Sequence, residues 1–155
     1  MNELVYRNLS EDAKRQICAW KYGGEYDLYN LPSYEEMQVR QIGFMNPQRE
    51  KNYYGFWDES ILVGFVNILE EKEEIFIGIG VNPDLCNKHY GQRMLSITYE
   101  ISKKLYPNKP LYLEVRTWNI RAVKCYQKAG FRIDGQAYEL TTGIGTGIFY
   151  RMIRE

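Results

Sequence analysis

Two residues with chemically useful side chains, Asn119 and Tyr126, lie seven positions apart in the segment NIRAVKCYQKAG. Seven residues make about two helical turns, so both side chains project from one face if the segment is helical. The spacing indicates a ligand along this helix. The alternative is that Asn119 only caps the helix and Tyr126 only packs.

The stretch VNPDLCNKHYGQRML, residues 81–95, joins an apolar strand-like run to a helix-like run. The unpaired N–H groups at a helix N-terminus and the positive end of its dipole favour phosphate groups, and Lys88 and Arg93 add positive charge. The stretch lacks the Gly-Lys-Ser/Thr of a P-loop, and GIGVNP lacks the third glycine of a dinucleotide fingerprint. GIGTG at 143–147 precedes a strand-like run, so we expect a flexible hairpin loop there. A loop that binds nothing is the alternative for residues 82–92.

Cys86 and His89 stand three positions apart, which raises the question of a thiol nucleophile or a metal site. Two ligands are too few for a zinc site, and the chain has a single histidine. We therefore expect no metal. Cys125 lies inside the predicted helix beside Tyr126 and is expected to belong to the core.

The elements that position these residues follow from polar and apolar periodicity and from capping residues. Strands are predicted at 4–9, 52–58, 61–71, 73–81, 110–115, 131–138 and 147–153, and helices at 10–20, 33–44, 91–106 and 119–130. Ser10, Ser33 and Asn119 are the expected N-caps, Gly130 is the expected stop of the last helix, and 22–32 is expected to be a loop. This order predicts an α/β chain in which an antiparallel meander runs into a β-α-β-α unit.

Composition limits the class of protein. The chain of 155 residues has 20 basic and 20 acidic side chains, three cysteines and no polybasic run. Zero net charge argues against a nucleic-acid or anionic-membrane partner. No apolar run reaches ~18 residues and the start MNELVYRNLSEDAK has no apolar region, so we expect neither a membrane span nor a signal peptide. An odd number of widely spaced cysteines without an export signal is typical of reduced cytosolic thiols. We expect one cytoplasmic domain, residues 1–155, as a monomer or homodimer.

Together, VNPDLCNKHYGQRML and LEVRTWNIRAVKCYQKAGF resemble the two central motifs of the GNAT superfamily of acetyl-CoA-dependent N-acetyltransferases. The second stretch matches the family pattern at Asn119, Ala122, Tyr126, Gly130 and Phe131. In the first, Gly91 keeps the pattern, whereas Cys86 replaces the usual Arg or Gln and His89 the usual first glycine. If position 89 requires a positive φ, histidine is less favourable there than glycine, and we expect weaker cofactor affinity.

The resemblance implies a mixed, mostly antiparallel sheet of about six to seven strands flanked by about four helices. It also implies direct attack of a primary amine on acetyl-CoA, with Tyr126 as general acid toward the thiolate and Glu114 as candidate base. Glu114 lies where the ribosomal-protein N-terminal acetyltransferases place a glutamate base; an ion pair with Arg116 is the equally weighted alternative. The implied cofactor-binding residues are Ile79, Gly80, Val81, Asn87, Lys88, His89, Tyr90, Gly91, Gln92, Asn119 and Tyr126.

The segment 22–39 holds four acidic residues and four tyrosines without a lysine or arginine. In the family, the first two helices and their loop line the acceptor cleft, so we expect Glu25, Tyr26, Asp27 and Tyr29 to bind a cationic amine through charge and cation–π contacts. An aminoglycoside, a polyamine and a protein amine are the candidates. A solvated acidic loop is the alternative at this segment. For the whole chain, the alternative is a non-catalytic module that binds acyl-CoA.

Overall fold

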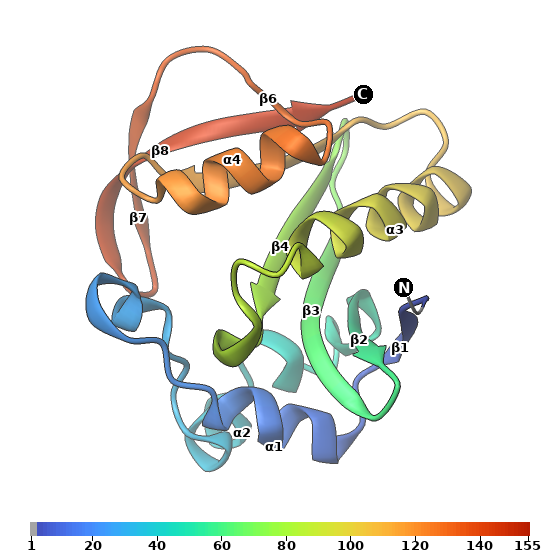
Figure 1. Ribbon diagram of the computed structural model, residues 1–155, viewed down its shortest axis with the longest axis vertical. Coiled ribbons are helices and arrows are strands. Elements are labelled where there is room, and N and C mark those ends of the chain that lie inside the picture. Colours follow the sequence, from blue (N-terminus) through green and yellow to red (C-terminus); the bar gives the residue numbers. More distant parts are fainter. Residues whose placement is uncertain (1–2) are drawn as a thin grey trace. The chain divides into compact units, whose positions relative to one another are not determined.

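The computed structural model describes residues 3–155. They form two compact units, and each unit is made of two separate stretches of the chain. The first unit runs to Asn67 and adds Ile79–Lys88, and the second comprises Ile68–Gly78 and His89–Glu155. The strands β3 (Ile61–Glu70) and β4 (Ile75–Val81) are neighbours in the sheet (Figure 1). Each contributes residues to both units. We therefore describe each unit by itself, and the expectation of a single domain stays a prediction.

The first unit packs α1 (Glu11–Ala19) and α2 (Tyr34–Arg40) with β1 (Val5–Asn8), β2 (Tyr53–Asp58) and most of β3. Both helices begin at the predicted caps: Ser10 Oγ accepts from the Ala13 amide and Ser33 Oγ from the Glu36 amide, each at 3.1 Å. Short 3-10 helices occupy Gly24–Tyr29 (η1), Gly43–Met45 (η2), Glu50–Asn52 (η3) and Pro83–Leu85 (η4). One cluster of its buried core consists of Leu9, Ala13, Ile17, Cys18, Tyr34, Met37, Phe44, Met45, Trp57 and Leu62.

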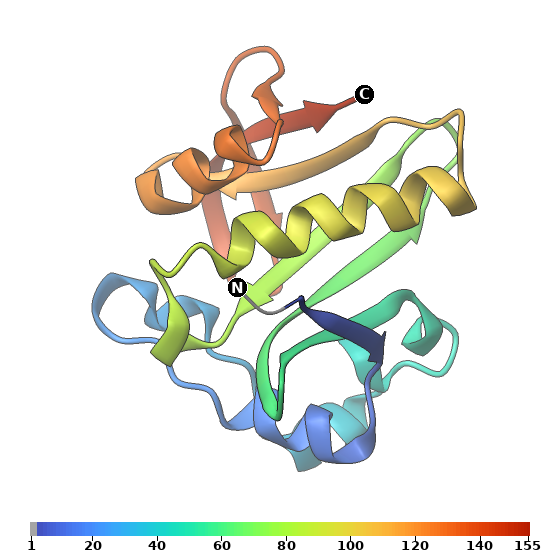
Figure 2. The same ribbon diagram turned by 45° about the vertical axis from the view of Figure 1, so that its right-hand side comes forward.

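The second unit contains the longest helix, α3 (Tyr90–Leu105), and the strand-helix pair β5 (Leu111–Arg116) and α4 (Ile120–Lys128). It closes with β6 (Arg132–Ile133), β7 (Tyr138–Thr142) and β8 (Gly145–Arg154). Figure 2 shows α4 along β5 and β8. Leu111, Leu113 and Val115 are buried on one face of β5, which places Tyr112 and Glu114 on the other.

The strands follow the order β1-β2-β3-β4-β5-β8-β6, with β7 also beside β8. Their pairing is antiparallel between β1 and β2, β2 and β3, and β8 and each of β5, β6 and β7. The parallel pairing of β4 with β5 consists of Ile75–Leu111 and Phe76–Tyr112. The predicted fold class, a mixed and mostly antiparallel sheet with four helices, is confirmed, and the sheet has eight strands among residues 3–155 instead of six to seven.

Three predicted boundaries are wrong. The second helix ends at Arg40, not near Phe44, because Gln41 takes a left-handed conformation with φ of 52°. The predicted strand 131–138 divides into β6 and the start of β7, since Gly135 between them has a positive φ of 80°. The predicted loop 22–32 contains η1. The GIGTG stretch does lie in a hairpin, but β8 already begins at Gly145.

Candidate active site

The end of β4, within the first unit, is held by hydrogen bonds from two other segments. The Asn82 amide donates to the Val63 carbonyl at 2.9 Å, and Asn82 Nδ2 donates to the Leu62 carbonyl at 3.2 Å. From the other side, the Tyr22 hydroxyl donates to the Val81 carbonyl at 2.7 Å. These bonds fix the strand end that carries the predicted cofactor-binding residues Ile79, Gly80 and Val81, and they attach it to the predicted acceptor loop.

The turn after β4 is organised by Asn82. Its Oδ1 accepts from the Asp84 amide at 3.0 Å, and its carbonyl accepts from the Leu85 amide at 2.9 Å and from Cys86 Sγ at 3.7 Å. Cys86, which replaces the family's usual Arg or Gln, thus contacts the backbone of its own turn. The exposed residues Asn87 and Lys88 complete the first unit.

The turn before α3 holds His89 in a conformation with positive φ. Asn87 has φ of 65° and His89 has φ of 67°, so the condition for a steric penalty at position 89 is met. In the second unit, His89 is the N-cap of α3 without a side-chain capping bond, and its carbonyl accepts from the Arg93 amide at 3.2 Å. The amides of Tyr90, Gly91 and Gln92 therefore lie at the N-terminus of a 16-residue helix. Such a terminus favours an anion.

The helix α4, also in the second unit, has the predicted cap and stop. Asn119 is buried, and its Oδ1 accepts from the Ala122 amide at 3.2 Å. Gly130 has φ of 98° and follows the helix end, where the Tyr126 carbonyl accepts from the amides of Ala129 and Phe131 at 3.1 and 3.0 Å. Asn119 and Tyr126 therefore belong to one helix, as the spacing predicts. Cys125 is half-buried, and burial raises the pKa of its thiol.

Glu114 on β5 has a different partner from the predicted Arg116. Its Oε2 accepts from the Tyr138 hydroxyl of β7 at 2.5 Å. The Arg116 guanidinium instead lies 4.8 Å from the centre of the Phe149 ring and donates to the Gly145 carbonyl at 3.5 Å. Burial, and after it the hydrogen bond to Glu114, raises the pKa of Tyr138. The Glu114 carboxylate thus accepts a hydrogen bond from a neutral group, the Tyr138 hydroxyl. It does not form the structural ion pair with Arg116 that was the alternative to a role as base.

A charged cluster lies next to Glu114 on β8, within the second unit. Arg151 is the register partner of Glu114, pairs with Glu74 and with Asp134 at 3.1 Å, and lies 4.4 Å from the centre of the Tyr112 ring. Burial, and then the hydrogen bond from the Tyr112 hydroxyl to Glu71 at 2.8 Å, raises the pKa of Tyr112. The sequence analysis did not predict the roles of Tyr138 and Tyr112. Their partners, Glu114 and Glu71, lie 24 and 41 residues away in the chain, so no local pattern indicates these bonds.

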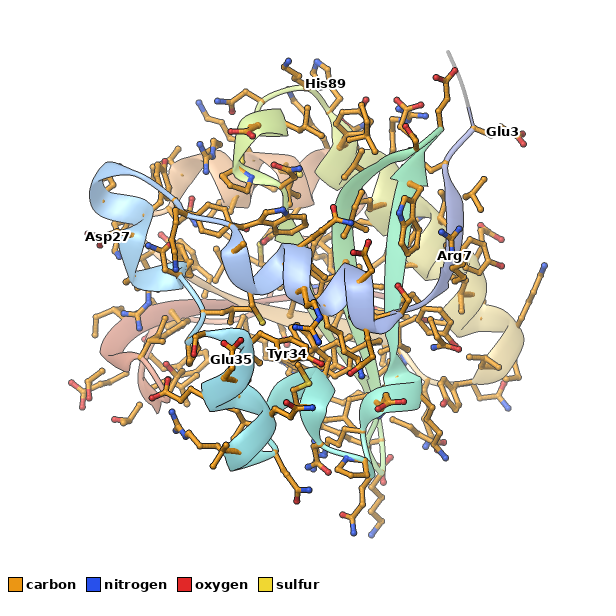
Figure 3. The ribbon with its side chains drawn as sticks, turned by 90° about the horizontal axis from the view of Figure 1, so that it is seen from below. Glu3, Arg7, Asp27, Tyr34, Glu35 and His89 are labelled. Carbon is orange, nitrogen blue, oxygen red and sulfur yellow. The ribbon has the colours of Figure 1, made fainter. Side chains whose placement is uncertain are left out.

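The predicted acceptor residues all lie on η1 in the first unit. Glu25 and Asp27 are exposed, and Tyr26 and Tyr29 are half-buried. Figure 3 places Asp27 on the turn of η1 and Glu35 on the first turn of α2. Tyr34, in contrast, belongs to the buried core, where its hydroxyl donates to Glu11 Oε1 at 2.9 Å and its ring lies under the Arg15 guanidinium. Of the four tyrosines in segment 22–39, Tyr34 is therefore not exposed for contact with an amine.

Among the residues the structure describes, no group of three or more His, Cys, Asp or Glu side chains could hold a metal ion. None of the helices within residues 3–155 is both long enough and apolar enough to cross a membrane.

Residues 10–131 match the model of the acetyltransferase (GNAT) family. The probable spermine N(1)-acetyltransferase of Bacillus subtilis subsp. natto (strain BEST195) is 30% identical over 100 residues, which are 57% of this chain and 66% of that protein. The match thus spans slightly less than two thirds of that relative.

Solved structures share the fold. Spermidine N-acetyltransferase from Vibrio cholerae, in complex with CoA and spermine, superposes with a TM-score of 0.77 at 19% identity, covering 97% of this chain and 94% of that one. AAC(6')-Ib, in complex with ribostamycin and coenzyme A, gives a TM-score of 0.74 at 16% identity, covering 99% and 93%. The fold and the matched region together define the class of protein. The chain belongs to the acetyltransferase (GNAT) family.

Proposed function

We propose that this chain transfers the acetyl group of acetyl-CoA to a primary amine of a polyamine, with Tyr126 as the general acid. The observation that carries the proposal is the geometry of α4. Asn119 caps this helix through its side chain, Tyr126 lies seven residues further along it, and Gly130 ends it in a left-handed conformation. The residues that match the family motif are thus also the residues that determine where the helix begins and ends.

The backbone fits an acyl-CoA ligand. Asn87 and His89 have positive φ in the turn before α3, and the amides of Tyr90, Gly91 and Gln92 open that helix. The pairing of β4 with β5 consists of two residue pairs at the start of both strands, so it does not take up the later amides of β4. These amides, within Ile79–Val81, are suited to receive a carbonyl oxygen on which negative charge develops.

Acetyl-CoA supplies the thioester, and the residues of the chain hold and move protons. A primary amine is mostly an ammonium ion at neutral pH and must lose a proton before it attacks. Glu114 is the proposed acceptor of that proton, and its hydrogen bond from Tyr138 keeps the carboxylate in one orientation. The Tyr126 hydroxyl then donates a proton to the departing thiolate.

A polyamine is the acceptor best supported. The curated relative is a probable spermine N(1)-acetyltransferase, and the Vibrio cholerae enzyme was solved with CoA and spermine. In this chain, the exposed carboxylates of Glu25 and Asp27 lie on η1 with the half-buried rings of Tyr26 and Tyr29. Carboxylates and aromatic faces are the groups that attract alkylammonium ions.

Thiol release from acetyl-CoA tests the proposal when it is measured with spermine, spermidine, an aminoglycoside and a peptide with a free N-terminus. We expect release with the polyamines, and we expect Tyr126→Phe to lower kcat by about 100-fold while acetyl-CoA still binds. Calorimetric binding of acetyl-CoA without release for any amine would instead support the non-catalytic module. Release with the peptide but not with polyamines would overturn the proposed acceptor.

A further inference from the structure

Asn67, near the end of β3 in the first unit, carries a polar atom that the fold does not satisfy. Its Oδ1 is buried and has no hydrogen-bond partner among the residues the structure describes. A buried oxygen without a donor destabilises the folded state, so its presence calls for a reason. Asn67 as a whole is half-buried. The Asn67 nitrogen is not among the described buried atoms without a partner, so a half-turn of the terminal amide, which interchanges the two atoms, moves the oxygen to the end that is not enclosed.

Aromatic rings surround this amide on the same face of the sheet. Tyr53 on β2 is the register partner of Asn67, which puts the two side chains directly opposite each other. Phe65 precedes Asn67 by two residues on β3 and so shares its face. The ring centres of Tyr53 and Phe65 are 6.4 Å apart, and those of Trp20 and Phe65 are 6.3 Å apart. All three rings are only half-buried, so the cluster is not closed off as a core.

Phe65 also links this face to the strand end that carries the proposed acyl site. A Cβ added at Gly80 would lie 2.5 Å from the Phe65 ring, so the ring lies directly over the Gly80 backbone. Gly80 belongs to the same unit as Phe65, Tyr53 and Asn67. A group bound against Phe65 is therefore close to the amides that would receive the thioester carbonyl.

We propose that Asn67, Tyr53 and Phe65 form the subsite that binds the alkylammonium end of the acceptor, the end that becomes acetylated. The Asn67 amide oxygen accepts an N–H of the ammonium, and the two rings attract its charge through their faces. This inference rests on the proposed function and names the residues that select the acceptor. It gives the polar side chain in this aromatic cluster a ligand to bind.

Charge around the cluster is compatible with a cation. Arg49 lowers the pKa of Tyr53, but burial of the ring outweighs it and raises that pKa overall. The Arg49 side chain is exposed, so solvent and salt screen its repulsion of a bound ammonium. Tyr53 is therefore a neutral ring at neutral pH, where alkylamines are protonated.

Two substitutions separate the roles of the amide and the rings. Asn67→Leu keeps the approximate size and removes the hydrogen-bond acceptor, so we expect an unchanged or higher Tm together with a KM for spermine raised about 10-fold to 100-fold. Phe65→Leu removes a ring and should raise the same KM about 3-fold to 30-fold. Both variants should leave the KM for acetyl-CoA within about twofold of the parent. Tyr54→Leu, on the opposite face of β2, is the matched control and should leave both KM values unchanged.

Inhibition by small ammonium ions gives a readout that a structural role would not change. Ethylammonium has N–H groups, so both Asn67→Leu and Phe65→Leu should weaken its inhibition. Tetramethylammonium has none, so only Phe65→Leu should weaken its inhibition. Polyamine turnover with unchanged KM and inhibition in both variants would overturn the subsite and leave the proposed function intact. Absence of polyamine turnover in the parent protein would overturn the proposed function and the subsite with it.

Discussion

The Tyr138 hydroxyl donates a hydrogen bond of 2.5 Å to Glu114 Oε2, which joins β7 to the middle of β5. A carboxylate that loses such a donor is oriented less well for its proposed role as proton acceptor. We therefore expect Tyr138→Phe to lower kcat/KM for the polyamine by about 10-fold. Rates of thiol release at several polyamine concentrations measure the effect. Equal kcat/KM values for parent and Tyr138→Phe would contradict this role.

The raised pKa values of Tyr112 and Tyr138 make the stability of the fold sensitive to alkaline pH. Burial is the larger cause in both, followed by the hydrogen bonds to Glu71 and Glu114. The folded protein holds these protons more tightly than the unfolded chain, whose tyrosines titrate near pH ~10. This stabilisation is therefore complete below about pH 10 and is lost as the pH rises through the folded-state values.

Urea titrations at intervals from pH 8 to pH 11 test this pH dependence. We expect the free energy of unfolding to fall above about pH 10 in the parent protein, and to fall less steeply in the double variant Tyr112→Phe/Tyr138→Phe. The single variants should lie between the two. Equal slopes in parent and double variant would show that neither phenol controls the alkaline limit.

Gly80 is required by packing rather than by backbone conformation. A methyl group there would meet ring atoms of Phe65 at 2.5 and 2.9 Å, and Phe65 is itself packed against Phe44 and Tyr53. We expect Gly80→Ala to lower the free energy of unfolding by about 1–3 kcal/mol. Gly23→Ala is the matched control, because φ at Gly23 is −97° and its added Cβ would have no atom within 4 Å. Equal effects at both positions, measured by urea unfolding, would contradict the steric account.

Sequence reasoning succeeded where a single local interaction decides the structure. Ser10, Ser33 and Asn119 cap helices through bonds to an amide three residues ahead, and this spacing can be read directly from the chain. The end of α2 at Gln41 was not predicted, because glutamine carries no preference for the left-handed conformation found there. In this chain, local sequence patterns predict where helices begin, but they do not predict a helix end at which no glycine follows.

The candidate site could be predicted only in part. Its motif residues on α4 share one short segment, so spacing alone aligned Asn119 with Tyr126. The partner of Glu114 could not be predicted, since strand alternation offered Arg116 on the same face and Tyr138 is positioned only once the β7–β8 hairpin pairs with β5. The Asn67 cluster likewise depends on the register between β2 and β3, which a one-residue shift would reverse.

His89 holds a left-handed conformation that glycine adopts without steric cost. We expect His89→Gly to raise the free energy of unfolding by up to about 1 kcal/mol and to tighten the binding of acetyl-CoA, because the turn before α3 is then less strained. Asn87→Gly is the comparison, since asparagine tolerates φ of 65° better than histidine and should gain less. Calorimetric titration with acetyl-CoA measures the affinity. An unchanged or weaker affinity in His89→Gly would remove the idea that this histidine limits binding.

The carboxylates of η1 should act on the acceptor at a distance through their charge. Glu25 and Asp27 are both exposed, so their attraction for a cationic amine is screened by salt. We expect Glu25→Gln/Asp27→Asn to raise the KM for spermine about 3-fold to 10-fold at low ionic strength and to leave the KM for acetyl-CoA unchanged. The increase should shrink at 0.5 M salt, where the Debye length is only about 4–5 Å. Glu73→Gln removes an exposed charge elsewhere and serves as the control. If the double variant and this control gave the same spermine KM at every salt concentration, the acidic loop would be a solvated surface without a role in acceptor binding.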